Sequence, residues 1–229
     1  MAAIADRIDV DGLAVTVRRS ARARRMTLRV GRVDGAVTLT LPPAVALSEA
    51  RAFARSHRRW IARQVAAAPS RHTVRVGGTV PFEGRALPVV AGRGRSAKFE
   101  GSVVVAPEDR TGPRVAALLK AVARDRLTEA AARHAAALGR PHGRITLRDP
   151  RSRWGSCSGR GDLMFSWRLV MAPPEVLDYV AAHEVAHLAH MDHSPRFWAC
   201  LERLLPGQGT HRTWLRDHGA GLHAVVFGG

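Results

Sequence analysis

The sequence predicts an α+β protein with a basic, strand-rich N-terminal region and a more helical remainder. Up to about residue 110, apolar residues alternate over short segments that Gly and Pro separate, a pattern typical of strands. From Pro113 the apolar period becomes helical, and a five-residue motif with metal-chelating spacing lies in a later helix. We therefore expect two domains, residues 1–110 and residues 111–229.

The N-terminal region should form a small antiparallel sheet interrupted by one helix. Alternating or β-branched segments predict strands at residues 13–17, 26–30 and 35–41, with shorter strands around 73–76, 86–90 and 102–105. Ser48 and Glu49 open a helix that we expect to continue to about Ala66, because its apolar residues recur at spacings of three and four.

The remainder should begin with the longest helix, from Pro113 to Leu138, which Gly139 ends. Two strands are predicted next, at residues 144–148 and 162–170, joined by a Gly- and Ser-rich turn over 152–161. Two further helices each begin at proline and are expected over residues 173–190 and 194–206.

The composition is that of a globular chain, with 46% apolar and 24% charged residues, which excludes intrinsic disorder. The net charge of +17 is unusual, and all but two of the 36 Lys and Arg residues are Arg. Residues 1–110 hold 20 cations and 9 anions. Such a charge indicates an anionic partner or, alternatively, a general compositional preference for Arg.

Six arginines lie within twelve residues that contain no acid: Arg18, Arg19, Arg22, Arg24, Arg25 and Arg29. Arginine is well suited to bidentate phosphate contacts, so this stretch is a candidate for binding nucleic acid or a nucleotide. No recognisable nucleic-acid-binding motif accompanies it. A solvated basic face in an Arg-biased protein is the alternative interpretation.

Cysteine usage and the N-terminus favour a cytoplasmic protein. Cys157 and Cys200 are too few for a disulfide framework or an all-cysteine zinc site. Asp6, Asp9 and Asp11 lie where a signal peptide would have its apolar core. No apolar run approaches the roughly 20 residues that a membrane span needs, so we expect no membrane partner.

The chemistry is concentrated in His183-Glu184-Val185-Ala186-His187, inside a predicted helix. Two histidines four positions apart lie one turn apart on one face, so both can bind one Zn²⁺ ion. A catalytic zinc site takes three protein ligands and leaves the fourth position to water. Glu184 is then the candidate general base for that water.

The third ligand must come from outside this motif. His193 lies just past the predicted helix end, where a chain reversal would bring it back towards the metal, and it is our preferred candidate. Glu202, on the following helix, is the competitor. His190 is better interpreted as exposed or as a supporting residue.

The chain resembles a known family in segments that follow one another in the family's order: residues 153–158 (RWGSCS), 167–170 (WRLV), 183–187 (HEVAH) and 193–198 (HSPRFW). Together they resemble the YgjP-like metal-dependent hydrolases, relatives of the SprT and WLM zinc metalloproteases within the zincin group. The resemblance implies a zincin-like domain, with His183, His187 and His193 as zinc ligands and Glu184 as general base. Ser166 departs from the family pattern, which usually has Asn there.

Three further residues are candidates for binding substrate or stabilising a transition state. Arg153 lies in the Gly- and Ser-rich turn and Arg168 in the strand predicted after it. Either could neutralise an oxyanion or a phosphate, or both could instead brace the sheet. Tyr179 lies one turn before His183 and could donate a hydrogen bond, or simply pack. Cys157 is best interpreted as a small buried thiol.

The leading hypothesis is a zinc-dependent metallopeptidase. Nucleoside triphosphate pyrophosphatase activity on UTP, which the resemblance also implies, would use the same metal site. A nucleic-acid-associated protein with a structural zinc site is the third hypothesis, although an intact Glu184 argues against it.

Overall fold

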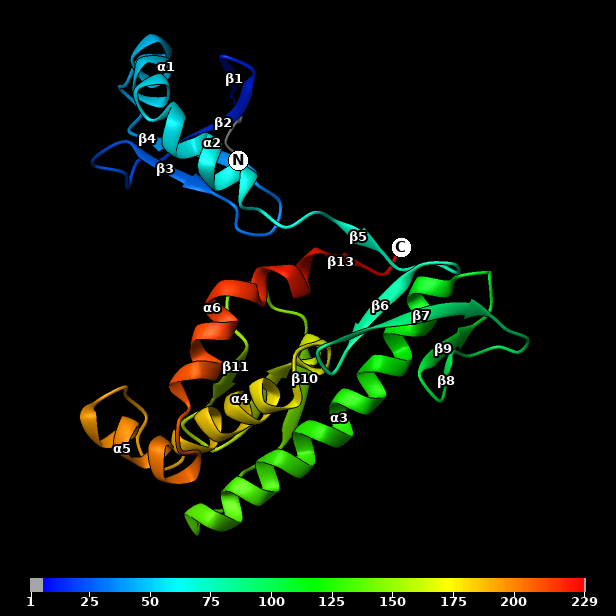
Figure 1. Ribbon diagram of the computed structural model, residues 1–229. Coiled ribbons are helices and arrows are strands. Elements are labelled where there is room, and N and C mark those ends of the chain that lie inside the picture. The colour runs from blue at the N-terminus through cyan, green and yellow to red at the C-terminus, as the bar shows by residue number, and fades with distance from the viewer. Residues whose placement is uncertain (1–5, 229) are drawn as a thin grey trace. The chain divides into compact units, whose positions relative to one another are not determined.

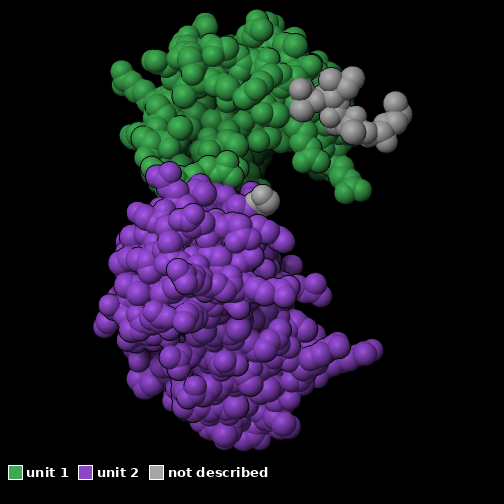
Figure 2. Space-filling view, turned by 90° about the vertical axis from the view of Figure 1, so that its right-hand side faces the viewer, with its two compact units in different colours: residues 1–71 green, residues 72–229 purple. Residues whose placement is uncertain are grey.

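The computed structural model describes residues 6–228 and confirms the α+β class, with six α-helices and several small sheets in that range. The chain forms two compact units, residues 1–71 and residues 72–229 (Figure 2). No helix within residues 6–228 combines the length and the apolar character needed to span a bilayer.

Unit 1 pairs one sheet with two helices. Its elements are β1 (Asp6–Val10), β2 (Leu13–Arg19), β3 (Thr27–Val30), β4 (Val37–Leu41), α1 (Leu47–Ser56) and α2 (Arg58–Ala66). The strand order is β1-β2-β4-β3, and β2 and β4 run parallel. The single helix predicted over 48–66 is two helices, because the backbone leaves the helical region at His57, whose N–H bonds back to the Ala54 carbonyl at 3.2 Å.

The core of unit 1 lies between one face of this sheet and the two helices. Alternate strand residues are fully buried there together with the inner helix residues; the set includes Val15, Val17, Leu39, Leu41, Ala50, Ala54 and Ile61. The period-two alternation recognised in the sequence therefore reports this one-sided burial.

Unit 2 holds the remaining elements (Figure 1). In chain order they are β5 (His72–Thr73), β6 (Thr79–Phe82), β7 (Arg85–Ala91), β8 (Lys98–Glu100), β9 (Val103–Ala106), α3 (Thr111–Leu138), β10 (Ile145–Arg148), β11 (Gly155–Cys157), β12 (Leu163–Ser166), η1 (Trp167–Met171), α4 (Pro174–Ala186), α5 (Pro195–Leu204), α6 (Gly209–Ala224) and β13 (Val225–Val226). They form a β6-β7-β9-β8 sheet, a β10-β12-β11 sheet and a β5-β13 pair.

The units divide at residue 71, whereas the sequence pattern predicted a boundary at 110. The strands between residues 79 and 106 bury Val80, Val89 and Val104 in the same apolar core as α3 and α4. In addition, β5 pairs in parallel with β13, from the other end of unit 2. The change of pattern at 110 is thus a change of secondary structure within one core.

Two elements next to the predicted metal motif differ from the expected pattern. The predicted strand 162–170 is β12 followed by the 3₁₀ helix η1, and helix α6 was not predicted at all. Helices α3 and α4 pack against each other, and η1 packs against both. Strand β11, predicted as part of a turn, is an edge strand of its sheet and contacts α4.

Candidate metal centre

Helix α4 begins at Pro174, where a proline needs no helical N–H partner, and it is buried on most of its surface. Val180, Ala181 and Val185 have no more than 3% of their surface exposed, so packing fixes the helix in position. His183 and Glu184 therefore project from a rigid element, and His187 lies at its C-terminal end.

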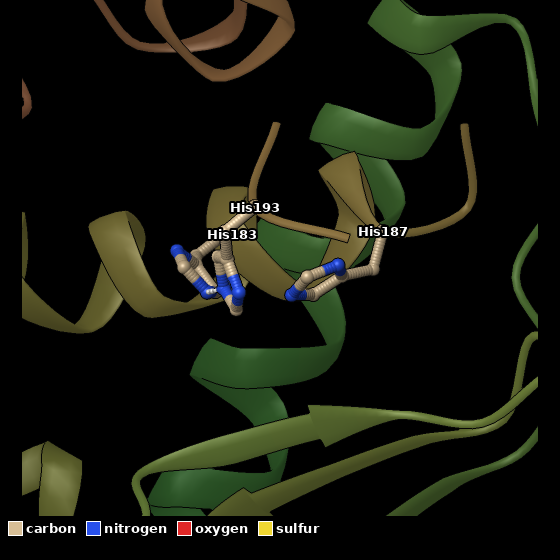
Figure 3. A group of neighbouring side chains, drawn as sticks. All are labelled: His183, His187 and His193. Atoms are coloured by element: carbon tan, nitrogen blue, oxygen red, sulfur yellow. Dashed lines mark hydrogen bonds between the residues drawn. The ribbon is translucent and has the colours of Figure 1, made fainter. Parts of the chain in front are cut away.

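Three histidines converge beside this helix. One ring nitrogen from each of His183, His187 and His193 lies within 4.8 Å of the others (Figure 3). The Nε2 atoms of His183 and His193 are 3.2 Å apart. Two nitrogens bound to one tetrahedral zinc at 2.0–2.1 Å would lie about 3.3–3.4 Å apart, so this spacing fits a shared Zn²⁺ ion.

The hydrogen bonds around His187 also fit a metal. Its Nδ1 lies 3.0 Å from the His190 carbonyl oxygen, to which it donates, and this leaves the Nε2 lone pair for an ion. Burial, with smaller contributions from His187 and His193, lowers the pKa of His183 to about 3. That imidazole therefore stays neutral in mild acid, and the neutral form is the one that binds metals.

His193 reaches the cluster because the chain reverses after α4. The N–H groups of Leu188, Ala189 and His190 bond back to the last turn of the helix, and α5 then begins at Pro195. The Trp198 indole donates to the His193 carbonyl at 3.0 Å and so holds the reversal. Glu202 is engaged elsewhere, since its Oε1 accepts from the Gly207 N–H at 2.8 Å.

Glu184 is the buried acid of the site, with 5% of its surface exposed. Burial raises its pKa to about 8, although the charge of Arg153 acts in the opposite direction. Strand β11 lies directly against it: a Cβ atom built on Gly155 would come within 2.5 Å of Glu184 Oε1. Glycine at this position is therefore what lets the strand approach the acid.

The residues nominated for substrate contacts have different surroundings. The charge of Arg153 opposes the rise that burial causes in the pKa of Glu184. Tyr179 is buried and lies edge-on to His183, with ring centroids 5.9 Å apart. Burial also raises the pKa of Tyr179, so its hydroxyl keeps its proton.

The contacts of Arg168 differ from the prediction that this residue binds substrate. It makes a bidentate pair with Asp149, at 2.7 and 3.1 Å, and donates to the carbonyls of Leu222 and Val225 at 2.8 and 2.9 Å. These partners occupy its guanidinium in tying η1 to the end of α6. Arg168 is therefore a brace, which was the alternative role for this residue.

Arg212 of α6 is the residue at the site that sequence reasoning missed. Its guanidinium lies over the Trp198 ring, 4.7 Å from the centroid. Its charge contributes to lowering the pKa of His183 and opposes the burial that raises the pKa of Tyr179. Within the described residues, no carboxylate lies within ion-pair distance of it. No signal in the sequence pointed to it, because α6 lacks a clear apolar period.

Comparison with known proteins agrees with this geometry. The family model described as YgjP-like, metallopeptidase domain, matches residues 24–218. No match was found among curated proteins, and none among solved structures. Because the family match covers most of both units, the chain belongs to the YgjP-like family and carries its metallopeptidase domain.

Proposed function

We propose that unit 2 is a zinc-dependent metallopeptidase in which Glu184 is the general base. The observation that carries this proposal is the contact between Glu184 and edge strand β11, next to three converging histidines. The family description supports the same reaction class. Zinc held by His183, His187 and His193 would supply a Lewis acid and an activated water.

Edge strand β11 supports a peptide substrate. In the described part of the chain it pairs with β12 on one side only, so we propose that the backbone groups along its other side pair with an extended chain. Main-chain pairing there would run a peptide past Glu184, because Gly155 holds the strand close to the carboxylate. Glu184 would take a proton from the attacking water and return it to the leaving amine.

Arg212 and Arg153 are the cations that we propose act on charge developing at the scissile group. Arg212 is held by stacking on Trp198, whose indole N–H donates a hydrogen bond to the carbonyl of His193. A fixed cation next to the reacting centre stabilises negative charge without reorganisation. Arg212→Gln should accordingly lower kcat while zinc content stays unchanged.

Within residues 6–228 the Arg212 guanidinium makes no ion pair with a carboxylate, and this also favours a second candidate, a nucleoside triphosphate such as UTP, hydrolysed at the same centre. Incubating zinc-loaded protein with casein, a peptide library and the four nucleoside triphosphates compares the two substrates. Peptide cleavage supports the first candidate, and release of pyrophosphate without peptide cleavage supports the second.

The Glu184→Gln variant tests the general base in either case. Retained zinc with lost turnover supports the catalytic proposal, whereas unchanged turnover contradicts it. Loss of zinc together with turnover would instead assign Glu184 a structural role at the metal site.

A further inference from the structure

The sheet of unit 1 has one face that its helices leave open. Residues of β2 and β4 such as Val15 and Leu39 are buried in the same core as the inner residues of α1 and α2. The residues that alternate with them must therefore point to the opposite side of the sheet. We call this opposite side the open face.

The strand register defines what the open face carries. Across β1, β2, β4 and β3, one row of paired positions holds Arg7, Thr16, Thr38 and Arg29. The next row holds Arg18, Thr40 and Thr27, and the row on the other side holds Asp9 and Ala14. The open face is thus a layer of arginine and threonine with a single acid at its margin.

These arginines are exposed, and no carboxylate among residues 6–228 forms an ion pair with them. Arg7, Arg18 and Arg29 are all exposed, and none makes an ion pair within the described part of unit 1. The ion pairs that unit 1 does form join Asp11 to two other arginines, Arg55 and Arg58, both at 3.6 Å. Residues 1–71 contain 14 Arg against five Asp and Glu, so the cations greatly exceed the available acids.

The loop between β2 and β3 extends the same surface. It adds three exposed cations, Arg22, Arg24 and Arg25, next to the end of the sheet at which Arg18 lies. Six exposed arginines therefore stand on the open face and its adjoining loop, in a unit that contributes no ligand to the metal centre.

The spacing of these cations indicates a polymeric anion. Strands lie about 4.8 Å apart, so Arg7 and Arg29 are separated by about 14 Å across three strand intervals. Six exposed arginines spread over the open face and its adjoining loop are more than one phosphate or nucleotide can engage, whereas successive phosphates of a nucleic acid can engage them together. The rows contain no aromatic residue on which an unpaired base could stack, and this favours a duplex over a single strand.

We propose that the open face of unit 1 binds double-stranded nucleic acid through its phosphates, without reading sequence. The arginine guanidinium groups would contact phosphate oxygens, and the threonine hydroxyls between them would donate hydrogen bonds to the same backbone. The open face shares no residue with the proposed hydrolase site, so binding of nucleic acid can be tested separately from the proposed reaction.

Fluorescence anisotropy with a labelled duplex of about 20 base pairs tests the proposal, because such a duplex spans the open face several times over. The test variant is Arg7→Gln/Arg18→Gln/Arg29→Gln. The matched control is Arg51→Gln/Arg59→Gln/Arg63→Gln, which removes the same charge from exposed positions of α1 and α2 on the other side of the sheet. Thermal unfolding of both variants verifies that unit 1 remains folded.

We expect the test variant to bind at least about 10-fold more weakly at moderate salt, and its log–log salt slope to fall by about 2 to 3. The control should stay within about threefold of the wild type. A Lys substitution at the same three test positions, which keeps the charge, should recover most of the binding. Removing zinc should change none of these values.

Three results would overturn the proposal. Equal losses in the test and control variants would mean that only net charge matters. Tighter binding of a single strand of the same length would reject the duplex. Absence of wild-type binding at moderate salt would remove nucleic acid as a partner and leave the proposed hydrolase untouched.

Discussion

Replacing Glu184 by Gln should stabilise the protein in its metal-free form, and increasingly so as pH rises. Burial raises the pKa of Glu184 from about 4.5 to about 8 in the folded state. Between these values the folded state binds more protons than the unfolded state, so stability falls as pH rises. Below about 4.5 both states are protonated, and above about 8 both are ionised.

The size of the effect follows from the same pKa shift. Each pH unit within this window changes the free energy of unfolding by about 1.4 kcal/mol, so the total between pH 5 and pH 8 reaches at most about 4 kcal/mol. Gln keeps the shape of the side chain and has no charge to bury. Every other side chain is the same in the two proteins, so the difference between their stability curves isolates Glu184.

Urea unfolding of chelator-treated wild type and Glu184→Gln from pH 5 to pH 9 measures this difference. Glu129→Gln, which removes an exposed carboxylate on α3, is the control and should track the wild type. Parallel curves for wild type and Glu184→Gln would refute the reasoning. Loading zinc should reduce the difference in stability between wild type and Glu184→Gln, because a cation next to the carboxylate favours its charged form.

The remaining predictions concern the third ligand, the edge strand and the brace. His193→Ala should weaken zinc binding by at least about 100-fold in equilibrium dialysis, whereas Glu202→Ala should leave it unchanged; the reverse result would reject His193 as a ligand. Gly155→Ala forces a Cβ atom to within 2.5 Å of Glu184 Oε1, so we expect about 1–3 kcal/mol of destabilisation in urea unfolding and lost turnover with zinc retained. Arg168→Leu breaks a bidentate pair and two bonds to carbonyls and should cost about 2–4 kcal/mol of stability, while zinc stoichiometry in the folded protein stays at the wild-type value.

Local patterns predicted much of the fold because one-sided burial imposes a period on the sequence. Helix α3 ends at Leu138 with Gly139 in a left-handed conformation, as its sequence indicates. The domain boundary could not be found in this way, because a composition shift at 110 reports the change from strand to helix. Which strands share a core with α3 depends on contacts between distant segments, such as the pairing of β5 with β13.

The difference between local sequence patterns and contacts between distant segments also decides what could be predicted of the candidate site. Two metal-ligand candidates and the candidate base lie on one helix, so their proximity follows from helical spacing alone. The roles of Arg168 and Arg212 depend on where α6 packs, and α6 has glycines at 209, 219 and 221 in place of a regular apolar stripe. Their roles therefore became visible only with the tertiary contacts of Trp198 and Asp149.

The burial that makes the metal-free site unstable is also suited to the proposed chemistry. A carboxylate held near 4.5 is a weak base at neutral pH, whereas one raised by burial to about 8 binds protons more strongly. Zinc would lower that value again towards neutrality, where a group can both take and return a proton. His183, neutral until about pH 3, stays available to hold the ion across this range. Glu184 would therefore act as base only with metal present, and zinc binding at pH 7 should release protons from it, a release that Glu184→Gln should diminish in unbuffered titrations.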